Sequence, residues 1–263
     1  PTLAVSFTDT TNLGGATLNS VLWNFGDGGT STDASPTHNY TTPGTYTVSL
    51  TVNTSEGTAT ETKTDYVAVN PVPTFTASAT SGASPFTVNF TDTTTLGSVT
   101  PTAYAWNFGD GGTSSAQNPS HTYVAAGVYT VTMIITSSQG QVVATETDLI
   151  TVSPDVQLST SASSGPTPLT VTVTDVTAIG NLTVTDWMWN FGDGTGTTTT
   201  QTNSMSHTYT TPGNYTPTLT IVTSGGNFSG SLAAPIMANP VPTFSADFRS
   251  GPGTFTVTFT DDT

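Results

Sequence analysis

Apolar and polar residues alternate along much of this chain with a period of two. The clearest apolar sets are Tyr46, Val48, Leu50 and Val52, and, further on, Tyr129, Val131, Met133 and Ile135. Threonine and serine occupy most positions between them. A period of two with β-branched polar partners predicts half-buried strands. Because no segment has a sustained helical period, the pattern predicts an all-β chain.

An internal repeat organises the whole sequence. The string Trp-Asn-Phe-Gly-Asp-Gly begins at residues 23, 106 and 189, so its spacing is 106 − 23 = 83 and 189 − 106 = 83. A His-x-Tyr marker begins at His38, His121 and His207, spaced by 83 and then 86 residues. Self-similarity at a fixed period indicates tandem copies of one structural unit. The additional residues of the third copy lie within 195–206, where we predict an insertion in a surface loop.

These offsets divide the chain into four segments. They are 1–70, a first repeat that lacks its opening strand; 71–153, a second repeat; 154–239, a divergent third repeat with a three-residue loop insertion; and 240–263, the start of a fourth. About seven short strands in each unit are typical of a β-sandwich. The expected fold class is therefore all-β, with tandem Ig-like β-sandwich domains in an extended linear array. The joints carry Asn-Pro-Val-Pro, whose prolines should stiffen them.

Three motifs follow one another in every repeat. In the first they are Trp23–Gly28, Pro36–Tyr40 and Pro43–Val52. In this order they resemble the polycystic kidney disease (PKD) domain. The resemblance implies an Ig-like sandwich of the kind found as a spacer or interaction module in surface-layer proteins, adhesins and secreted hydrolases. The third repeat departs from it at Pro217, where the other repeats have valine, which predicts an edge or bulged position.

Aromatic side chains are the expected source of stability, because the chain has no cysteine. One tryptophan in each repeat is placed to fill the space between two sheets. The predicted core aromatics are Trp23, Trp106, Trp189, Tyr46, Tyr129 and Tyr215.

Composition excludes several classes of partner. Lys63 and Arg249 are the only basic residues, against 17 acidic ones, and the formal net charge is −15. Nucleic acids and anionic membranes both require cationic faces, so neither is an expected partner. No apolar run is long enough to span a bilayer, so membrane insertion is not expected in this segment. The absence of cysteine and the abundance of threonine and serine favour an extracellular position, on a cell or virion surface.

The candidate chemical groups recur with the repeat. Each of the three histidines belongs to a different repeat, which favours a structural role such as bonding a turn carbonyl over a shared metal site. Asp27, Asp110 and Asp193 lie in Gly-Asp-Gly turns, where a short carboxylate caps backbone amides. Glycosylation stays open, because the six Asn-x-Ser/Thr sequons match the number expected by chance.

Calcium is the one cofactor that the acidic residues leave open. Its candidate ligands are Asp92 and Asp110, although no Asp-x-Asp-x-Asp-Gly loop occurs. No cofactor is otherwise expected. The chain has neither a cysteine nucleophile nor a serine motif with a matched histidine, and repeated units seldom form a cleft with paired carboxylates. We therefore expect no enzymatic activity.

Two functions fit these observations. The first is an extracellular structural rod, stalk or filament, and the alternative is an accessory carbohydrate- or protein-binding spacer of a secreted hydrolase or adhesin. Trp187, found only in the third repeat, is a candidate contact for surface polysaccharide, with packing in an enlarged core as the favoured interpretation. The expected partners are neighbouring repeats or other copies of the chain. Strand exchange between copies stays open, since residues 240–252 correspond to the opening strand that the first repeat lacks.

Overall fold

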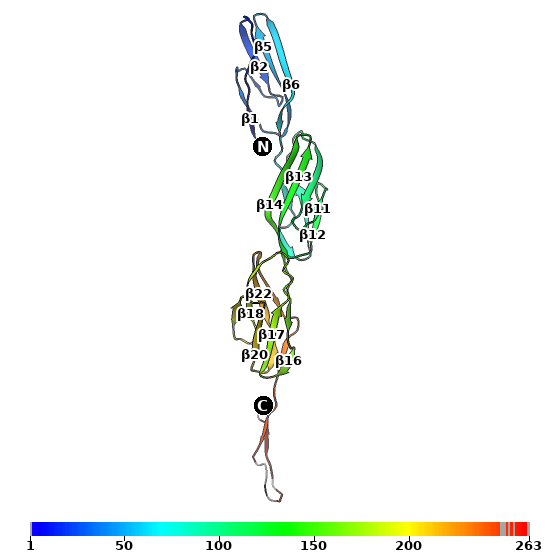
Figure 1. Ribbon diagram of the computed structural model, residues 1–263, viewed down its shortest axis with the longest axis vertical. Helices are drawn as coiled ribbons and strands as arrows, with labels where there is room; N and C mark the ends of the chain where they lie inside the picture. Colours follow the sequence, from blue (N-terminus) through cyan, green and yellow to red (C-terminus); the bar gives the residue numbers. More distant parts are fainter. Residues whose placement is uncertain (1, 248–250, 252, 255, 262–263) are drawn as a thin grey trace. The chain divides into compact units, whose positions relative to one another are not determined.

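The computed structural model describes residues 2–247, 251, 253–254 and 256–261 (Figure 1). These residues form β-strands and no α-helix, which confirms the all-β fold class. Among them there is accordingly no helix with the length and apolar character needed to cross a bilayer. Pro1, Arg249 and part of the predicted fourth repeat lie outside the described residues.

The first repeat has two sheets. A four-stranded sheet has the order β3-β2-β5-β6, and β1 pairs with β4 in a second sheet. The strands are β1 (Leu3–Ser6), β2 (Leu18–Asn24), β3 (Thr30–Ser31), β4 (Thr37–Tyr40), β5 (Gly44–Thr54) and β6 (Gly57–Val69).

The second repeat adds an opening strand to the same plan. Its sheets have the orders β12-β9-β7 and β11-β10-β13-β14-β8, with β14 and β8 parallel. The strands are β7 (Phe75–Ala77), β8 (Ser81–Ala83), β9 (Phe86–Asp92), β10 (Pro101–Asn107), β11 (Thr113–Ser114), β12 (Ser120–Tyr123), β13 (Gly127–Ser137) and β14 (Gly140–Ser153). Along β13 the residues 127, 129, 131, 133 and 135 are buried, as the period-two pattern predicts.

The third repeat forms three sheets with the orders β15-β17-β20, β16-β24-β21 and β19-β18-β22-β23. Beyond it, β25 (Phe244–Ala246) pairs with β26 (Phe259–Asp261). The strands of the third repeat are β15 (Leu158–Thr160), β16 (Ser164–Pro166), β17 (Leu169–Asp175), β18 (Val184–Asn190), β19 (Thr197–Thr200), β20 (Ser204–Tyr209), β21 (Gly213–Tyr215), β22 (Thr218–Thr223), β23 (Gly226–Ser231) and β24 (Ile236–Asn239).

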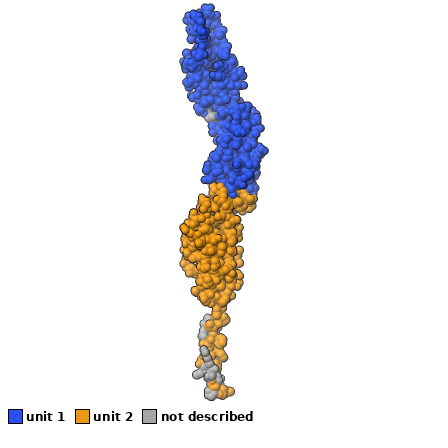
Figure 2. Space-filling view, viewed as in Figure 1, with its two compact units in different colours: residues 1–80, 87–122, 129–149 blue, residues 81–86, 123–128, 150–263 orange. Residues whose placement is uncertain are grey.

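The chain divides into two compact units, which Figure 2 colours separately. One unit comprises residues 1–80, 87–122 and 129–149, and the other comprises residues 81–86, 123–128 and 150–263. The division passes through the second repeat, so compactness and sequence repeat do not mark the same boundaries.

A tryptophan is buried in each repeat. Trp106 is 2% exposed and Trp189 is completely buried, while Trp23 is 7% exposed. The indole nitrogens of Trp23 and Trp106 donate hydrogen bonds to backbone carbonyls, at 3.1 Å to Asp33 and 2.9 Å to Ala116. A buried indole keeps a partner for its one donor in this way.

Pro217 interrupts a strand instead of bulging it. The other repeats have one eleven-residue strand at this place, β5 or β13, whereas the third has β21 and β22 on either side of residues 216–217. Proline has no N–H to donate to a ladder, so the sequence prediction of an edge or bulge understated the effect. The facing strand is divided as well, because β21 pairs with β24 and β22 with β23.

The insertion of the third repeat also differs from its prediction as a loop. It lengthens the strands on either side of it, β19 and β20, which belong to different sheets and have four and six residues against two and four in the second repeat. β19 pairs with β18 over four residues, and Trp189 Nε1 now donates to the hydroxyl of Thr200 at 3.2 Å. Threonine has a high strand propensity, so a threonine-rich insertion extends the ladder.

We predict that Trp189→Ala lowers the stability of the third repeat by about 3–5 kcal/mol, because it leaves a large cavity between the sheets. Hydrogen-exchange mass spectrometry should show faster exchange in peptides from residues 169–222 and little change in peptides from residues 18–54. Met188→Ala is the control, since Met188 is the next residue of β18 and is exposed to solvent. Equal effects of the two substitutions would contradict the prediction.

Candidate functional site

The most regular arrangement of polar groups lies at the Trp-Asn-Phe-Gly-Asp-Gly turn that follows β2, β10 and β18. The side-chain oxygen of Asn24 accepts a bond from the N–H of Gly26 at 3.0 Å, and Asn107 and Asn190 bond their own turns in the same way. Gly26 has φ +86°, and a Cβ there would lie 2.4 Å from the carbonyl oxygen of Thr47. Glycine is therefore required both by the backbone angle and by the close approach of the neighbouring strand.

The aspartate of this turn bonds two groups. Its Oδ1 accepts from a backbone N–H, at 2.9 Å from Gly29 for Asp27 and at 2.9 Å from Gly112 for Asp110. Its Oδ2 contacts a histidine Nε2, with distances of 2.7, 2.8 and 2.7 Å in the three repeats. The predicted amide cap is thus present, but the histidine bonds the aspartate and not a turn carbonyl.

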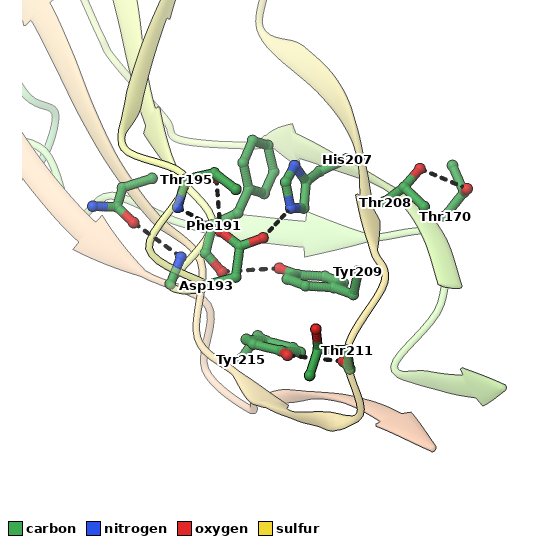
Figure 3. A network of polar contacts seen from close by, with 11 residues as sticks. Thr170, Phe191, Asp193, Thr195, His207, Thr208, Tyr209, Thr211 and Tyr215 are labelled. Carbon is green, nitrogen blue, oxygen red and sulfur yellow. Dashed lines mark hydrogen bonds and ion pairs between the residues drawn. The ribbon is translucent and has the colours of Figure 1, made fainter. Parts of the chain in front are cut away.

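Each of these histidines lies flat against the phenylalanine of the turn. His207 and Phe191 have ring centroids 4.2 Å apart and planes inclined by 6°. The other two pairs are alike, with centroid distances of 4.1 Å for Phe25–His38 and 4.2 Å for Phe108–His121. Because Asp fixes one ring nitrogen and Phe covers one ring face, the imidazole has a single orientation. Figure 3 shows this arrangement around Asp193.

Two tyrosines continue the stack that the turn phenylalanine and the histidine form. Tyr40 and Tyr209 each donate a hydroxyl bond of 3.0 Å to the carbonyl of the turn phenylalanine. In the third repeat the ring of Tyr209 stacks on that of Tyr215 at 4.2 Å, as Figure 3 shows. Tyr40, Tyr123 and Tyr209 are buried, whereas the predicted core residues Tyr46 and Tyr215 are half-buried and pack at the edge of the core. The position in His-x-Tyr was the signal for the buried tyrosines.

Electrostatics favours the charged form of the turn carboxylates. Burial acts to raise the pKa of Asp27, Asp110 and Asp193, but bonds from the histidine and from backbone amides outweigh it. The net result is a pKa below the ordinary value of 3.8 for all three. Stability linked to these groups is therefore present above pH 3.8 and is lost as the pH falls through the lowered pKa.

The pKa of the turn carboxylates is lowered on balance, whereas the pKa of the buried tyrosines is raised. Loss of solvent, aided by the negative charge of the turn aspartate and by the neighbouring tyrosine, raises the pKa of Tyr40 and of Tyr209 to about 12. Tyr104 also reaches about 12, because burial and its bond to Asp92 both oppose ionisation. The three hydroxyls therefore remain protonated in the folded chain at pH values where a free tyrosine ionises.

A second aromatic–carboxylate pair recurs two residues before the tryptophan in the second and third repeats. Tyr104 donates its hydroxyl to Asp92 at 3.0 Å, and 83 residues later Trp187 donates its Nε1 to Asp175 at 2.7 Å. Trp187 is half-buried and packs against the core of the third repeat. The indole considered as a polysaccharide contact therefore has its polar atom bonded within the protein and its ring against apolar side chains.

The calcium candidates also bond groups within the protein. Asp92 accepts bonds from the Thr94 amide, from Tyr104 and from Gln117, while Asp110 bonds His121 and Gly112. These are two separate networks. Within the part of the chain that the structure describes, no group of three or more His, Cys, Asp or Glu side chains could hold a metal ion.

The ends of the repeats contact each other through glycine turns. In one unit the amide of Ser98 donates to the Pro43 carbonyl at 3.2 Å, and a Cβ on Gly97 would lie 2.0 Å from that oxygen. In the other unit a Cβ on Gly180 would lie even closer to the Ala126 carbonyl oxygen, and Asn181 bonds both the N–H and the C=O of Val128 at 3.0 Å. Sequence reasoning missed this contact, although glycines at 14, 97 and 180 repeat every 83 residues.

Comparison with known proteins identifies the family. The family model described as "PKD domain" matches residues 1–69, 68–152 and 154–234. The chain belongs to the PKD-domain family. This confirms the resemblance and the Ig-like β-sandwich inferred from the recurring motifs.

The curated relatives of these PKD repeats match over short stretches. Collagenase ColA of Bacillus cereus is 68% identical over 38 residues, which are 14% of this chain and 4% of that protein. A microbial collagenase of Vibrio alginolyticus is 63% identical over 46 residues, 17% of this chain and 6% of that protein. The chain thus spans a small part of the length of both relatives.

Solved structures similar to the chain include other PKD domains. The PKD1 domain of the Vibrio cholerae metalloprotease PrtV is 28% identical, with a TM-score of 0.28, and covers 32% of this chain and 98% of that domain. The PKD1 domain of Vibrio anguillarum Epp is 29% identical, with a TM-score of 0.28, at the same coverage.

We predict that acid destabilises the PKD repeats through the turn carboxylates. Urea unfolding of the wild type should show falling stability below pH 3.8. A triple variant Asp27→Asn, Asp110→Asn, Asp193→Asn should depend less on pH in this range and lose about 1–2 kcal/mol per repeat at neutral pH, because charge-assisted bonds become neutral ones. Asp33→Asn, at an exposed position, is the control. An unchanged acid profile in the triple variant would refute the assignment.

We also predict that Tyr40, Tyr104 and Tyr209 titrate late. Absorbance at 295 nm should show Tyr40, Tyr104 and Tyr209 ionising near pH 12 in the folded chain, and all tyrosines near pH 10 in urea. Because the raised pKa favours folding, its contribution is complete below pH 10 and is lost as the pH rises through 12. Tyr104→Phe should remove one late-titrating group. A folded chain in which every tyrosine ionises near pH 10 would exclude the bonding described here.

Proposed function

We propose that this chain is a non-catalytic structural spacer, a segment of an extracellular rod, stalk or filament built of PKD repeats. The observation that carries the proposal is the glycine turn that contacts the preceding repeat. It occurs once in each compact unit, between Gly97 and Pro43 and between Gly180 and Ala126. A backbone-to-backbone contact of this kind restricts the orientation of consecutive repeats, as a spacer of defined length requires.

Side-chain contacts at these joints support the proposal. The amide of Gln139 donates to the hydroxyl of Thr45 at 2.7 Å, so the β13–β14 hairpin also contacts the first repeat. The corresponding residue of the third repeat is Gly225, where a Cβ would lie 3.2 Å from a methyl group of Val128. Each joint is therefore formed by two turns of one repeat and by one end of the repeat before it.

The surface composition fits an extracellular position. The chain has 63 threonines and 27 serines, but only two lysines and arginines together. Hydroxyls and a net charge of −15 keep such a chain in solution, while proteases that cut after basic residues find almost no site. Stability comes from packed and stacked aromatic side chains and not from disulfides, so it is independent of the redox state of the surroundings.

A second candidate function is that of an accessory module in a secreted hydrolase. The similarity to two bacterial collagenases, at 68% and 63% identity over short stretches, favours it. In that case the repeats would hold a catalytic domain at a distance from its substrate, or bind collagen or polysaccharide themselves.

The spacer proposal predicts that the joint glycines limit motion between repeats. Gly97→Ala and Gly180→Ala should each broaden the pair-distance distribution in small-angle scattering, since the added Cβ meets a carbonyl oxygen. Gly14→Ala is a matched control. Its φ of +59° equals those of the other two within 2°, but a methyl group added there would have no atom within 4 Å. A compact wild-type particle, or equal effects of all three variants, would refute the proposal.

The alternative predicts direct binding to the substrate of a hydrolase. Co-sedimentation with collagen fibrils or with insoluble polysaccharide should then retain the chain at micromolar concentrations. Trp187→Phe keeps an aromatic ring but removes the donor to Asp175, so it tests the indole as a contact without emptying the core. Absence of binding to both materials would exclude the accessory-binding function.

A further inference from the structure

The joint between the first and second repeats and the joint between the second and third share a backbone contact but differ in side chains. The glycine turn occurs in both, with Gly97 at the first joint and Gly180 at the second. Three positions beside this turn carry different residues. Thr45, Val99 and Gln139 at the first joint correspond, by the repeat spacing of 83 or 86 residues, to Val128, Leu182 and Gly225 at the second.

A hydrogen bond between two side chains closes the first joint. The Nε2 of Gln139 donates to the hydroxyl of Thr45 at 2.7 Å, although the two residues are 94 positions apart. The Oε1 of the same amide is buried and accepts no bond from the described residues. Because a buried amide without partners costs free energy, Gln139 fits this joint only where a hydroxyl faces its Nε2.

The second joint is apolar at the corresponding place. A Cβ on Gly225 would lie 2.7 Å from Leu182 Cδ2, 3.2 Å from Val128 Cγ2 and 3.8 Å from Thr151 Cγ2. The last distance is an ordinary contact, but the first is shorter than carbon atoms reach without a shift. A glutamine at position 225 would therefore overlap the leucine and bring its amide among methyl groups.

The residues of each joint also compensate for one another in size. The second joint combines the smallest residue, Gly225, with Leu182, whereas the first combines the long side chain of Gln139 with the shorter Val99. Both Leu182 and Val99 are buried. Replacement of one member alone would leave either a cavity or an overlap, and both are destabilising. Each set of three residues is therefore matched within its own joint.

We propose that these two sets determine which repeat follows which. The end of the first repeat, with Thr45, accepts the hairpin that carries Gln139, and the end of the second, with Val128, accepts the hairpin that carries Gly225. The wrong pair is rejected, because it buries an amide without a partner or leaves a cavity. Repeats with similar ends can dock in the wrong order, within one chain or between two copies, and such matching opposes this. The inference rests on the proposed spacer function and adds to it the specificity of each joint.

Native-state hydrogen exchange of the full chain, measured by NMR, reports on each joint separately. The amide of Ser98 donates to the Pro43 carbonyl at 3.2 Å across the first joint, and that of Asn181 donates to the Ala126 carbonyl at 3.3 Å across the second. Each amide exchanges when its own joint opens, so its exchange rate measures how often that joint is open. Slow exchange of both amides is expected in the wild type.

A single substitution should open one joint and leave the other closed. Gly225→Gln should speed exchange of the Asn181 amide by about tenfold or more and leave the Ser98 amide unchanged. The backbone of Gly225 lies outside the left-handed region, so the substitution tests the side chain alone. Asn227→Gln, at an exposed position two residues further on, is the matched control. Amides of β22 should stay protected in both variants, which shows that the third repeat remains folded.

Transfer of a whole set tests the matching itself. The triple variant Val128→Thr, Leu182→Val, Gly225→Gln gives the second joint the residues of the first. It should return the Asn181 amide to within about threefold of its wild-type exchange rate, because coupled residues are not additive. A triple variant that exchanges as fast as Gly225→Gln alone, or a Gly225→Gln chain with the wild-type rate, would overturn the proposal.

The reciprocal exchange at the first joint tests the proposal independently. Thr45→Val removes the acceptor of Gln139 and should speed exchange of the Ser98 amide, and addition of Val99→Leu and Gln139→Gly should slow it again. Unequal rates without this recovery would overturn the matching and leave the spacer function intact. Fast exchange of both reporter amides in the wild type would mean that the joints are open, and would overturn the spacer function as well.

Discussion

The bond between the turn aspartate and the histidine fixes the packing of each repeat. It holds the imidazole flat on the turn phenylalanine, at 4.1–4.2 Å between ring centroids. The phenylalanine carbonyl receives the hydroxyl of a buried tyrosine in the first and third repeats. A carboxylate–imidazole bond, an aromatic stack and a buried hydroxyl therefore depend on one another. In a domain of about 83 residues without disulfides, such a network supplements a small core.

The third repeat keeps the aspartate–histidine bond although its strands differ from those of the other repeats. Pro217 divides a long strand, an insertion lengthens β19 and β20, and Trp189 bonds Thr200 instead of a backbone carbonyl. The distance between Asp193 and His207 nevertheless stays at 2.7 Å, although 14 residues separate them instead of 11. The added residues lie outside the turn and the His-x-Tyr strand end, so the network is kept while the connection between them varies.

A contact between consecutive repeats also recurs along the chain. A glycine turn at the end of one PKD repeat approaches a carbonyl oxygen at the end of the preceding one, and only a residue without a Cβ fits there. In the second repeat the opening strand contributes Phe75, whose ring lies across the indole of Trp106. The glycine contact is local and recurs between the first and second repeats and between the second and third. A chain of this kind can therefore be lengthened by adding units.

The sequence by itself determined the family, the repeat, the strands and the buried tryptophans, because these follow from period-two alternation and from motifs at constant spacing. It did not show that aspartate and histidine pair, that Tyr40, Tyr123 and Tyr209 are more buried than Tyr46 and Tyr215, or that Gly97 and Gly180 contact preceding repeats. Those facts depend on which side chains meet across sheets and turns that are distant in the chain. Local pattern gives the inward or outward direction of a residue, but only the tertiary structure decides which partner it meets.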